Sequence, residues 1–255
     1  MLKDITLGQY FPGNSIAHKL DPRTKILLVT LYIIALFSAK GWMGYAVMAV
    51  TLAACVKVSH VGLRALVRGL KPLVFIIAFT GILNMFFTPD THYLWEWGIL
   101  RVSVKGIENA LFMVIRIMLL VMGTFLMTYT TSPIRLTDGL ESLLNPLKKI
   151  HVPVHELAMM MAIALRFIPT LIEETDKIMS AQKARGADFD SGNIFQKAKA
   201  LVPILVPLFI SAFRRADELA TAMECRCYHG GEGRTKLHVL KYQRRDYVAL
   251  AGGAV

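Results

Sequence analysis

Apolar and polar positions divide the chain into two parts of different character. In the first part, apolar runs cover residues 26–39, 42–56, 73–87 and 107–130, with charged or turn-forming residues between them. Such runs are typical of membrane spans, for which about 20 residues are usual. The last run is the longest and best span. The first run is short, but Lys25 and Lys40 at its ends can extend their ammonium groups to the membrane surface.

The segment 61–71 has a different pattern, in which apolar and basic residues lie on different helical faces. Leu63, Leu66, Val67 and Leu70 share one face, and Arg64, Arg68 and Lys71 lie away from it. This pattern predicts an interfacial helix lying on the membrane. Together with Lys57, the loop holds four cations and no carboxylate, which predicts a cytoplasmic location.

The segment 88–105 predicts a small extended or hairpin-like element on the outer side. Thr88-Pro89-Asp90 ends the third run, and residues 93–104 then alternate, with Trp95 and Trp97 as interfacial aromatics. Acids balance bases in this segment, as expected for an outer loop.

Residues 132–235 show helical spacing with frequent charges and predict three long amphipathic helices. The first begins at Ser132-Pro133, the second runs from Pro153 to Arg185, and the third from about Ile194 to Cys227. Pro169 should kink the second helix, and Gly186 fits a left-handed cap. The apolar part of the third helix, 201–213, is short for a span. We therefore expect it at the cytoplasmic boundary of the membrane, crossing the second helix at small residues such as Ala181 and Ala222.

The ends of the second and third helices resemble each other. Residues 176–186 and 217–227 share Asp-x-x-x-x-Ala-x-x-x-Arg, with small residues on both sides of Arg185 and of Arg226. Such a repeat predicts two copies of one unit, each presenting an arginine at its C-terminal tip, with the tips held side by side. Chance similarity between two alanine-rich helices is the alternative.

Composition supports a membrane protein. The 255 residues are 55% hydrophobic, with a mean hydropathy of +0.49. The net charge of +11 favours cytoplasmic basic loops, since no basic tract interleaved with aromatics indicates nucleic-acid binding. The three cysteines make no disulfide framework, and Cys225 and Cys227 lack the spacing and the second pair of a zinc site. Because Lys3, Asp4, Pro12 and Gly13 come before any apolar run, we expect no cleavable signal peptide.

Three features bear on catalysis and transport. Arg116 lies near the middle of the last span, where an ionisable residue is a functional candidate, although a role in orienting helices is favoured. His155-Glu156 lacks the second histidine of H-E-x-x-H, which argues against an intramembrane metalloenzyme. No phosphate-binding loop of the G-x-x-x-x-G-K-[ST] type occurs, so the chain is expected to hydrolyse no ATP. A self-sufficient carrier or channel remains an alternative, although it would need more polar residues in the spans.

The lead Gly8-Gln-Tyr-x-Pro-Gly-x-Ser-x-x-His-x-Leu-Asp-Pro-Arg-x-Lys25, the four spans and the paired arginine tips resemble the transmembrane component of energy-coupling factor transporters. These are prokaryotic importers of vitamins and transition metals. The resemblance covers essentially the whole chain.

The resemblance implies a non-catalytic, multi-pass subunit of the cell membrane that needs no cofactor. Two cytoplasmic ATP-binding subunits, identical or different, would dock on the tips, and a separate substrate-binding membrane subunit (the S component) would dock on the apolar side of the coupling helices. The docking residues carried over are Ala184, Arg185 and Gly186 in the first tip and Cys225, Arg226 and Cys227 in the second. The second tip departs from the common form, because Cys227 stands where glycine would be usual and its Cβ disfavours the cap conformation.

The expected fold is an all-α integral membrane protein of about five transmembrane helices with a cytoplasmic coupling domain. The N-terminal lead, 1–25, would be cytoplasmic, residues 26–131 would hold the first four spans, and residues 132–235 would form the coupling domain. Residues 236–255 resemble the start of a last span that we expect to be incomplete.

Overall fold

The computed structural model describes residues 10–88, 93–97, 100–187, 189, 193–230 and 239–254. The chain forms two compact units. The first, here called the bundle unit, comprises Gly8–Gly139 and Leu240–Val255; the second, here called the two-helix unit, comprises Leu140–Val239. Each unit is described by itself.

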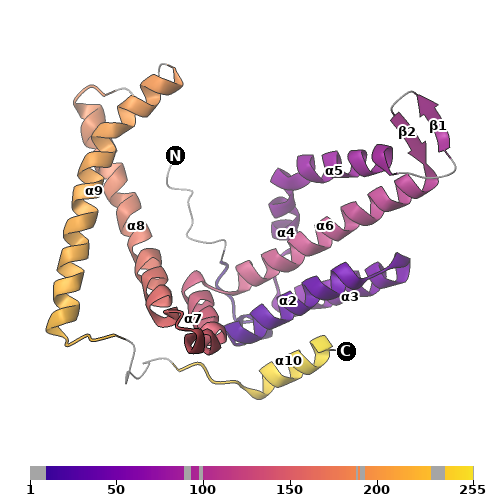
Figure 1. Ribbon diagram of the computed structural model, residues 1–255, viewed down its shortest axis with the longest axis horizontal. Helices are drawn as coiled ribbons and strands as arrows, with labels where there is room; N and C mark the ends of the chain where they lie inside the picture. The colour runs from indigo at the N-terminus through magenta and orange to yellow at the C-terminus, as the bar shows by residue number, and fades with distance from the viewer. Residues whose placement is uncertain are drawn as a thin grey trace. The chain divides into compact units, whose positions relative to one another are not determined.

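The bundle unit is built almost entirely from helices (Figure 1). Its elements in chain order are α1 (Ile16–Lys19), α2 (Pro22–Ser38), α3 (Gly41–Ser59), α4 (Leu63–Leu70), the 3₁₀ turn η1 (Lys71–Leu73), α5 (Val74–Phe87), β1 (Tyr93–Trp97), β2 (Leu100–Ser103), α6 (Val104–Thr130) and α10 (Arg244–Ala254). α7 (Pro133–Leu144) leads into the two-helix unit, which holds the 3₁₀ segment η2 (Asn145–Ile150), α8 (Val154–Ala184) and α9 (Ile194–Cys225).

Four helical segments of the described chain are long and apolar enough to cross a membrane: Gly41–Ser59, Leu63–Phe87, Val104–Thr130 and Val154–Ala184. The all-α membrane class is thereby confirmed. The predicted interfacial helix forms as α4 and continues through η1 into α5, so 63–87 also qualifies as one segment. α2, with 17 residues, is too short to be counted among these segments. α8, which the sequence places in the cytoplasmic domain, meets the criterion of length and composition.

The core of the bundle unit surrounds α6. This helix packs against α2, α3, α4 and α5, and its Leu119 and Tyr129 join buried residues of α2, α3 and α4. Small residues permit the close approach of helices that membrane interfaces favour. A Cβ on Gly106 would lie 2.7 Å from the carbonyl oxygen of Met85, and one on Gly123 would lie 2.8 Å from the ring of Tyr32. Apolar side chains elsewhere point outward, as expected for a surface in contact with lipid.

The segment after α5 forms the predicted hairpin. β1 and β2 pair antiparallel, with Trp97 opposite Leu100 and Glu96 opposite Arg101. Residues 89–92, 98 and 99 of this expected loop lie outside the described residues.

The polar lead is fixed to the ends of other helices by hydrogen bonds. Nδ1 of the buried His18 lies 2.6 Å from the Ser15 hydroxyl, and its Nε2 lies 3.0 Å from the carbonyl oxygen of Phe11. Lys25 is buried as well, and its ammonium donates to the Thr130 carbonyl at 2.8 Å and to the Thr131 hydroxyl at 3.0 Å. Burial lowers the pKa of Lys25 to about 8.

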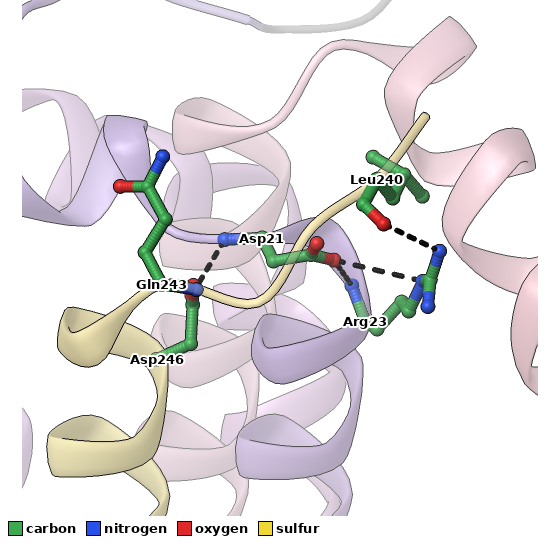
Figure 2. A network of polar contacts seen from close by, with 5 residues as sticks. All are labelled: Asp21, Arg23, Leu240, Gln243 and Asp246. Carbon is green, nitrogen blue, oxygen red and sulfur yellow. Dashed lines mark hydrogen bonds and ion pairs between the residues drawn. The ribbon is translucent and has the colours of Figure 1, made fainter. Parts of the chain in front are cut away.

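A buried carboxylate joins the lead to the C-terminal helix (Figure 2). Asp246, 2% exposed, accepts hydrogen bonds from the backbone N–H of Asp21 at 2.8 Å and of Gln243 at 2.7 Å. Asp21 in turn caps α2 by accepting from the N–H of Arg23, whose guanidinium donates to the carbonyl of Leu240. α2 and α10 therefore begin at the same end of the bundle unit.

α8 and α9 form an antiparallel pair. Gln182 near the end of α8 donates to the carbonyl of Pro203 near the start of α9 at 3.4 Å. That carbonyl lacks its usual helical donor because residue 207 is also proline. Further along, Glu174 accepts from the Ser211 hydroxyl and forms an ion pair with Arg215 at 2.9 Å. Figure 1 shows the two helices crossing near the C-terminal end of α8 and diverging from there.

Candidate functional site

The two predicted tips have the same backbone structure. At the end of α8, the N–H of Ala187 donates to the backbone carbonyl of Gln182 at 3.0 Å, and the N–H of Gly186 donates to the backbone carbonyl of Lys183 at 3.0 Å. This is the Schellman arrangement, in which a left-handed residue after the cap turns the chain back on the last helical turn. Gly186 has a φ of +88°, as the sequence predicted.

The second tip repeats these bonds despite its different residue. At the end of α9, the N–H of Tyr228 bonds to the carbonyl of Met223 at 3.1 Å, and that of Cys227 bonds to Glu224 at 2.8 Å. Cys227 adopts a φ of +56°, so the left-handed conformation forms in spite of its Cβ. Arg185 and Arg226 occupy the equivalent cap position with nearly equal dihedral angles, φ −86° and ψ 5° against φ −93° and ψ 15°.

Both arginine side chains are available for a partner. Arg185, Arg226 and their neighbours Ala184, Cys225 and Cys227 are all exposed. Within the described part of the chain, no hydrogen bond or ion pair engages either guanidinium. A guanidinium at a helix C-terminus complements the helix dipole and keeps its planar fork free for a carboxylate.

The expectation that the tips lie side by side is wrong. Because α8 and α9 run antiparallel, their C-terminal ends point in opposite directions (Figure 1). Gln182, three residues before Arg185, contacts Pro203 of α9, and a helical rise of about 1.5 Å per residue puts Arg226 on the order of 35 Å from that contact. The pair therefore presents one arginine at each end.

The hydrogen bonds between α8 and α9 also show where Ala181 and Ala222, the two alanines predicted at the crossing, lie along the helices. Bonds join Gln182 to Pro203 and Glu174 to Ser211, so Ala181 falls level with Ile204, about a third of the way along α9. Ala222 falls level with about Ile163, in the first third of α8, and the two alanines therefore do not face each other. Sequence reasoning missed the Glu174 contacts, because a carboxylate on an amphipathic helix is more often simply solvated.

Arg116 has a specific partner in the bundle unit. Its Nε and Nη2 donate to the hydroxyl of Tyr45 at 2.9 and 2.5 Å, and its guanidinium lies 5.6 Å from the centre of the Phe37 ring. Phe37 is at the end of α2 and Tyr45 at the start of α3. Arg116 thus holds together three helices, which agrees with the orienting role that sequence analysis favoured.

The histidine considered for a metalloenzyme has another partner. Nδ1 of His155 lies 3.0 Å from a carboxylate oxygen of Glu141. Among the described residues, no group of three or more His, Cys, Asp or Glu side chains could hold a metal ion.

Comparison with known proteins identifies the family. A family model described as "CbiQ: Cobalt transport protein" matches residues 13–237. The chain belongs to the CbiQ family. Proteins named "Energy-coupling factor transporter transmembrane protein EcfT" are similar along nearly their whole length. The one from Clostridium kluyveri is 56% identical over 250 residues, 98% of this chain and 93% of the relative.

Two further EcfT proteins give the same result. The protein from Ruminiclostridium cellulolyticum is 55% identical over 246 residues, which cover 96% of this chain and 92% of the relative. The protein from Bacillus subtilis is 48% identical over 246 residues, which cover 96% of this chain and 93% of the relative. As a CbiQ family member with such relatives, the chain is the transmembrane component of an energy-coupling factor transporter. The resemblance recognised in the sequence is confirmed, as is a location in a membrane.

Proposed function

We propose that this CbiQ family member is the coupling subunit of an ATP-driven micronutrient importer, with Arg185 and Arg226 as docking points for two separate ATP-binding subunits. The observation that carries the proposal is the repeated helix end. Two Schellman caps of the same geometry each present an exposed arginine with no partner in the described chain. Two equivalent ends suit two equivalent or related partners.

The antiparallel arrangement supports one partner at each end. A guanidinium fork pairs bidentately with a carboxylate, which gives a directional contact able to transmit movement. Ala184 and Gly186 at one tip, and Cys225 and Cys227 at the other, are small enough to let the tip enter a groove of the partner. ATP hydrolysis belongs to the partners in this proposal, since the sequence holds no phosphate-binding loop.

The apolar surface of the pair supports contact with a substrate-binding membrane subunit. α9 exposes large apolar side chains along its first two thirds, and α8 exposes several near its start. These residues are Leu157, Met160, Met161, Leu201, Val202, Leu205, Val206, Phe209, Ile210 and Phe213. Movement of α8 against α9, driven from the tips, would shift this surface and the subunit resting on it.

Charge reversal at the tips tests the docking assignment. Arg185→Glu or Arg226→Glu should weaken copurification with the ATP-binding subunits, and the double variant should abolish it, because a carboxylate repels the acidic groove expected on the partner. Arg214→Glu, at an exposed position of α9 away from the tip, is the matched control. A double variant that copurifies as well as the control would refute the assignment.

Topology decides whether both tips can meet cytoplasmic partners. If α8 crossed the membrane, the antiparallel pair would place Arg185 and Arg226 in different compartments; if the pair lies along the cytoplasmic surface, both are reachable from the cytoplasm. The chain has only three cysteines, and Cys225 and Cys227 flank the second tip. An impermeant maleimide should label them in inverted vesicles and not in intact cells.

The first tip needs an introduced thiol for the same experiment. Ala184→Cys, in a background with the three native cysteines replaced, occupies the position equivalent to Cys225. It should label in inverted vesicles only. Labelling of the two tips from opposite sides would end the proposal.

A cross-link tests movement between the helices. Glu174→Cys with Ser211→Cys places two thiols where the side chains already meet. The oxidised double variant should bind the ATP-binding subunits and fail to transport, and reduction should restore transport. Full transport by the oxidised form would refute the movement. Transport by the chain reconstituted alone would instead favour a self-sufficient carrier.

A further inference from the structure

A large apolar groove lies within the bundle unit, apart from the arginine tips. Its volume is about 970 Å³, and residues of α2, α3, α6 and α10 line it, together with α1. Ligand pockets in proteins typically measure about 300–1,000 Å³, so this groove is at the upper end of that range. Most of its lining is aliphatic, contributed by residues such as Leu28, Leu31, Val47 and Val248.

One face of α10 changes character along the groove. The lining residues of this helix, in order, are Arg244, Arg245, Val248, Ala249, Gly252 and Gly253. The charged residues therefore lie at the start of the helix, and the apolar and small residues follow. α10 has 11 residues and is about 16 Å long at 1.5 Å per residue.

The charged end of the groove lies at one surface of the bundle unit. α10 runs parallel to α2, since Asp246 binds Asp21 at the start of both helices and Gly253 packs on Leu28 about two turns further along. The polar lead surrounds this end, and the apolar run of α2 follows it. The groove therefore leads from the membrane surface into the apolar layer, whichever leaflet it opens to.

Two arginine side chains at this end have no partner in the described part of the chain. Arg244 and Arg245 are exposed, and no ion pair or hydrogen bond to either guanidinium occurs within the described residues. The third basic residue of the lining, Lys25, is already engaged by Thr130 and Thr131. Among the residues that the structure describes, no Asp or Glu lines the groove, and the nearby carboxylate of Asp246 is occupied by two backbone N–H groups.

We propose that this groove binds an anionic phospholipid, with its phosphate held by Arg244 and Arg245 and an acyl chain lying along Val248 to Gly253. Arginine forks pair bidentately with phosphate oxygens, and basic pockets at the membrane surface select anionic headgroups. The aliphatic lining supplies the environment that an acyl chain requires. A purely apolar partner helix would fill the same space and leave both guanidinium groups without an anion, which argues for the lipid.

Two kinds of variant separate the headgroup from the chain. Arg244→Gln with Arg245→Gln removes the phosphate ligands; Arg64→Gln with Arg68→Gln, two exposed arginines on α4 outside the groove, is the matched control. Gly252→Leu fills the groove, since a Cβ on Gly252 would have no neighbour within 4 Å. Gly62→Leu is its control, at a glycine with the same open surroundings that lies outside this groove.

The measurement is native mass spectrometry of the purified full-length chain with equal amounts of phosphatidylglycerol and phosphatidylcholine that carry the same acyl chains. The unaltered chain should retain phosphatidylglycerol preferentially. The Arg244→Gln/Arg245→Gln variant should lose that preference by about 30-fold, the factor that corresponds to about 1 kcal/mol for each of the two basic residues. Gly252→Leu should lower retention of both lipids, while both controls behave as the unaltered chain.

Three results would overturn the proposal. An equal loss in the Arg64/Arg68 control would mean that diffuse positive charge attracts the lipid. Retention unaffected by Gly252→Leu would mean that no chain lies in the groove. Displacement of phosphatidylglycerol by millimolar glycerol phosphate, without any lipid tail, would mean that the arginines bind a free anion.

Discussion

The carboxylate of Asp246 gives the sharpest test of how the bundle unit is held together. It accepts from the N–H of Asp21 and of Gln243 and is 2% exposed. In Asp246→Ala both N–H groups lose their acceptor, that of Asp21 in a buried place and that of Gln243 in a part-buried one. Each unsatisfied buried group costs about 1–3 kcal/mol, so the free energy of unfolding should fall by about 2–5 kcal/mol. Asp246→Asn keeps one acceptor oxygen and should lose about half as much.

Hydrogen exchange locates the effect where the structure puts it. The amides of Asp21 and Gln243 should exchange about 30-fold faster or more in Asp246→Ala, the factor that corresponds to 2 kcal/mol. Asp217→Ala, at an exposed position of α9, is the control and should change stability by less than about 0.5 kcal/mol. If Asp246→Ala exchanged at these two amides no faster than the control, the buried link between the lead and α10 would be refuted.

Three further changes probe other contacts of the bundle unit. Burial lowers the pKa of Lys25 to about 8 from its ordinary 10.5. Between these pH values the folded chain has lost the Lys25 proton while the unfolded chain still holds it, so the free energy of unfolding should rise with pH. Lys25→Met should remove this rise in Tm. Tyr45→Phe removes the acceptor for Arg116 and should cost about 1–2 kcal/mol in denaturant unfolding. Gly106→Ala pushes a methyl group against the Met85 carbonyl and should cost about 1–3 kcal/mol by the same measurement.

Each of these changes has a control of the same type. Lys148→Met and Tyr247→Phe alter exposed side chains, and Gly62→Ala adds a methyl group that meets nothing within 4 Å. The Lys25 prediction fails if the variant keeps the alkaline rise in Tm. The other two fail if the variant and its control unfold at the same denaturant concentration.

The sequence predicted the helices well because their determinants are local. Apolar runs and helical spacing located α2, α3, α5 and α6, and α8 and α9 begin and end within two residues of the predicted limits. The cap at Gly186 followed from the conformational freedom of glycine. The cap at Cys227 shows that the backbone bonds of the Schellman arrangement can impose the same turn on another residue.

Long-range partners could not be predicted from one sequence. Tyr45 and Arg116 are 71 positions apart, and Asp21 and Asp246 are 225 apart. Nothing in the local pattern of either residue indicates its partner. The repeat at Arg185 and Arg226 predicted two equivalent ends, but the direction of α9 relative to α8 depends on the Glu174 and Gln182 contacts. Those contacts separate the tips.

The contact between α8 and α9 is nearer to the Arg185 tip than to the Arg226 tip. If the helices rotate about this contact, the two tips lie at unequal distances from the axis of rotation. Its bonds involve Glu174 and Gln182 on α8 and Pro203 to Arg215 on α9. Measured along the helices from the middle of this contact, Arg185 is about 10 Å away and Arg226 about 25 Å away. The same angular swing therefore carries Arg226 roughly two and a half times as far as Arg185. If ATP-binding subunits dock on both tips as proposed, equal displacements of the two subunits would rotate the helices through different angles, and the two arginine ends would differ mechanically even though their caps are alike.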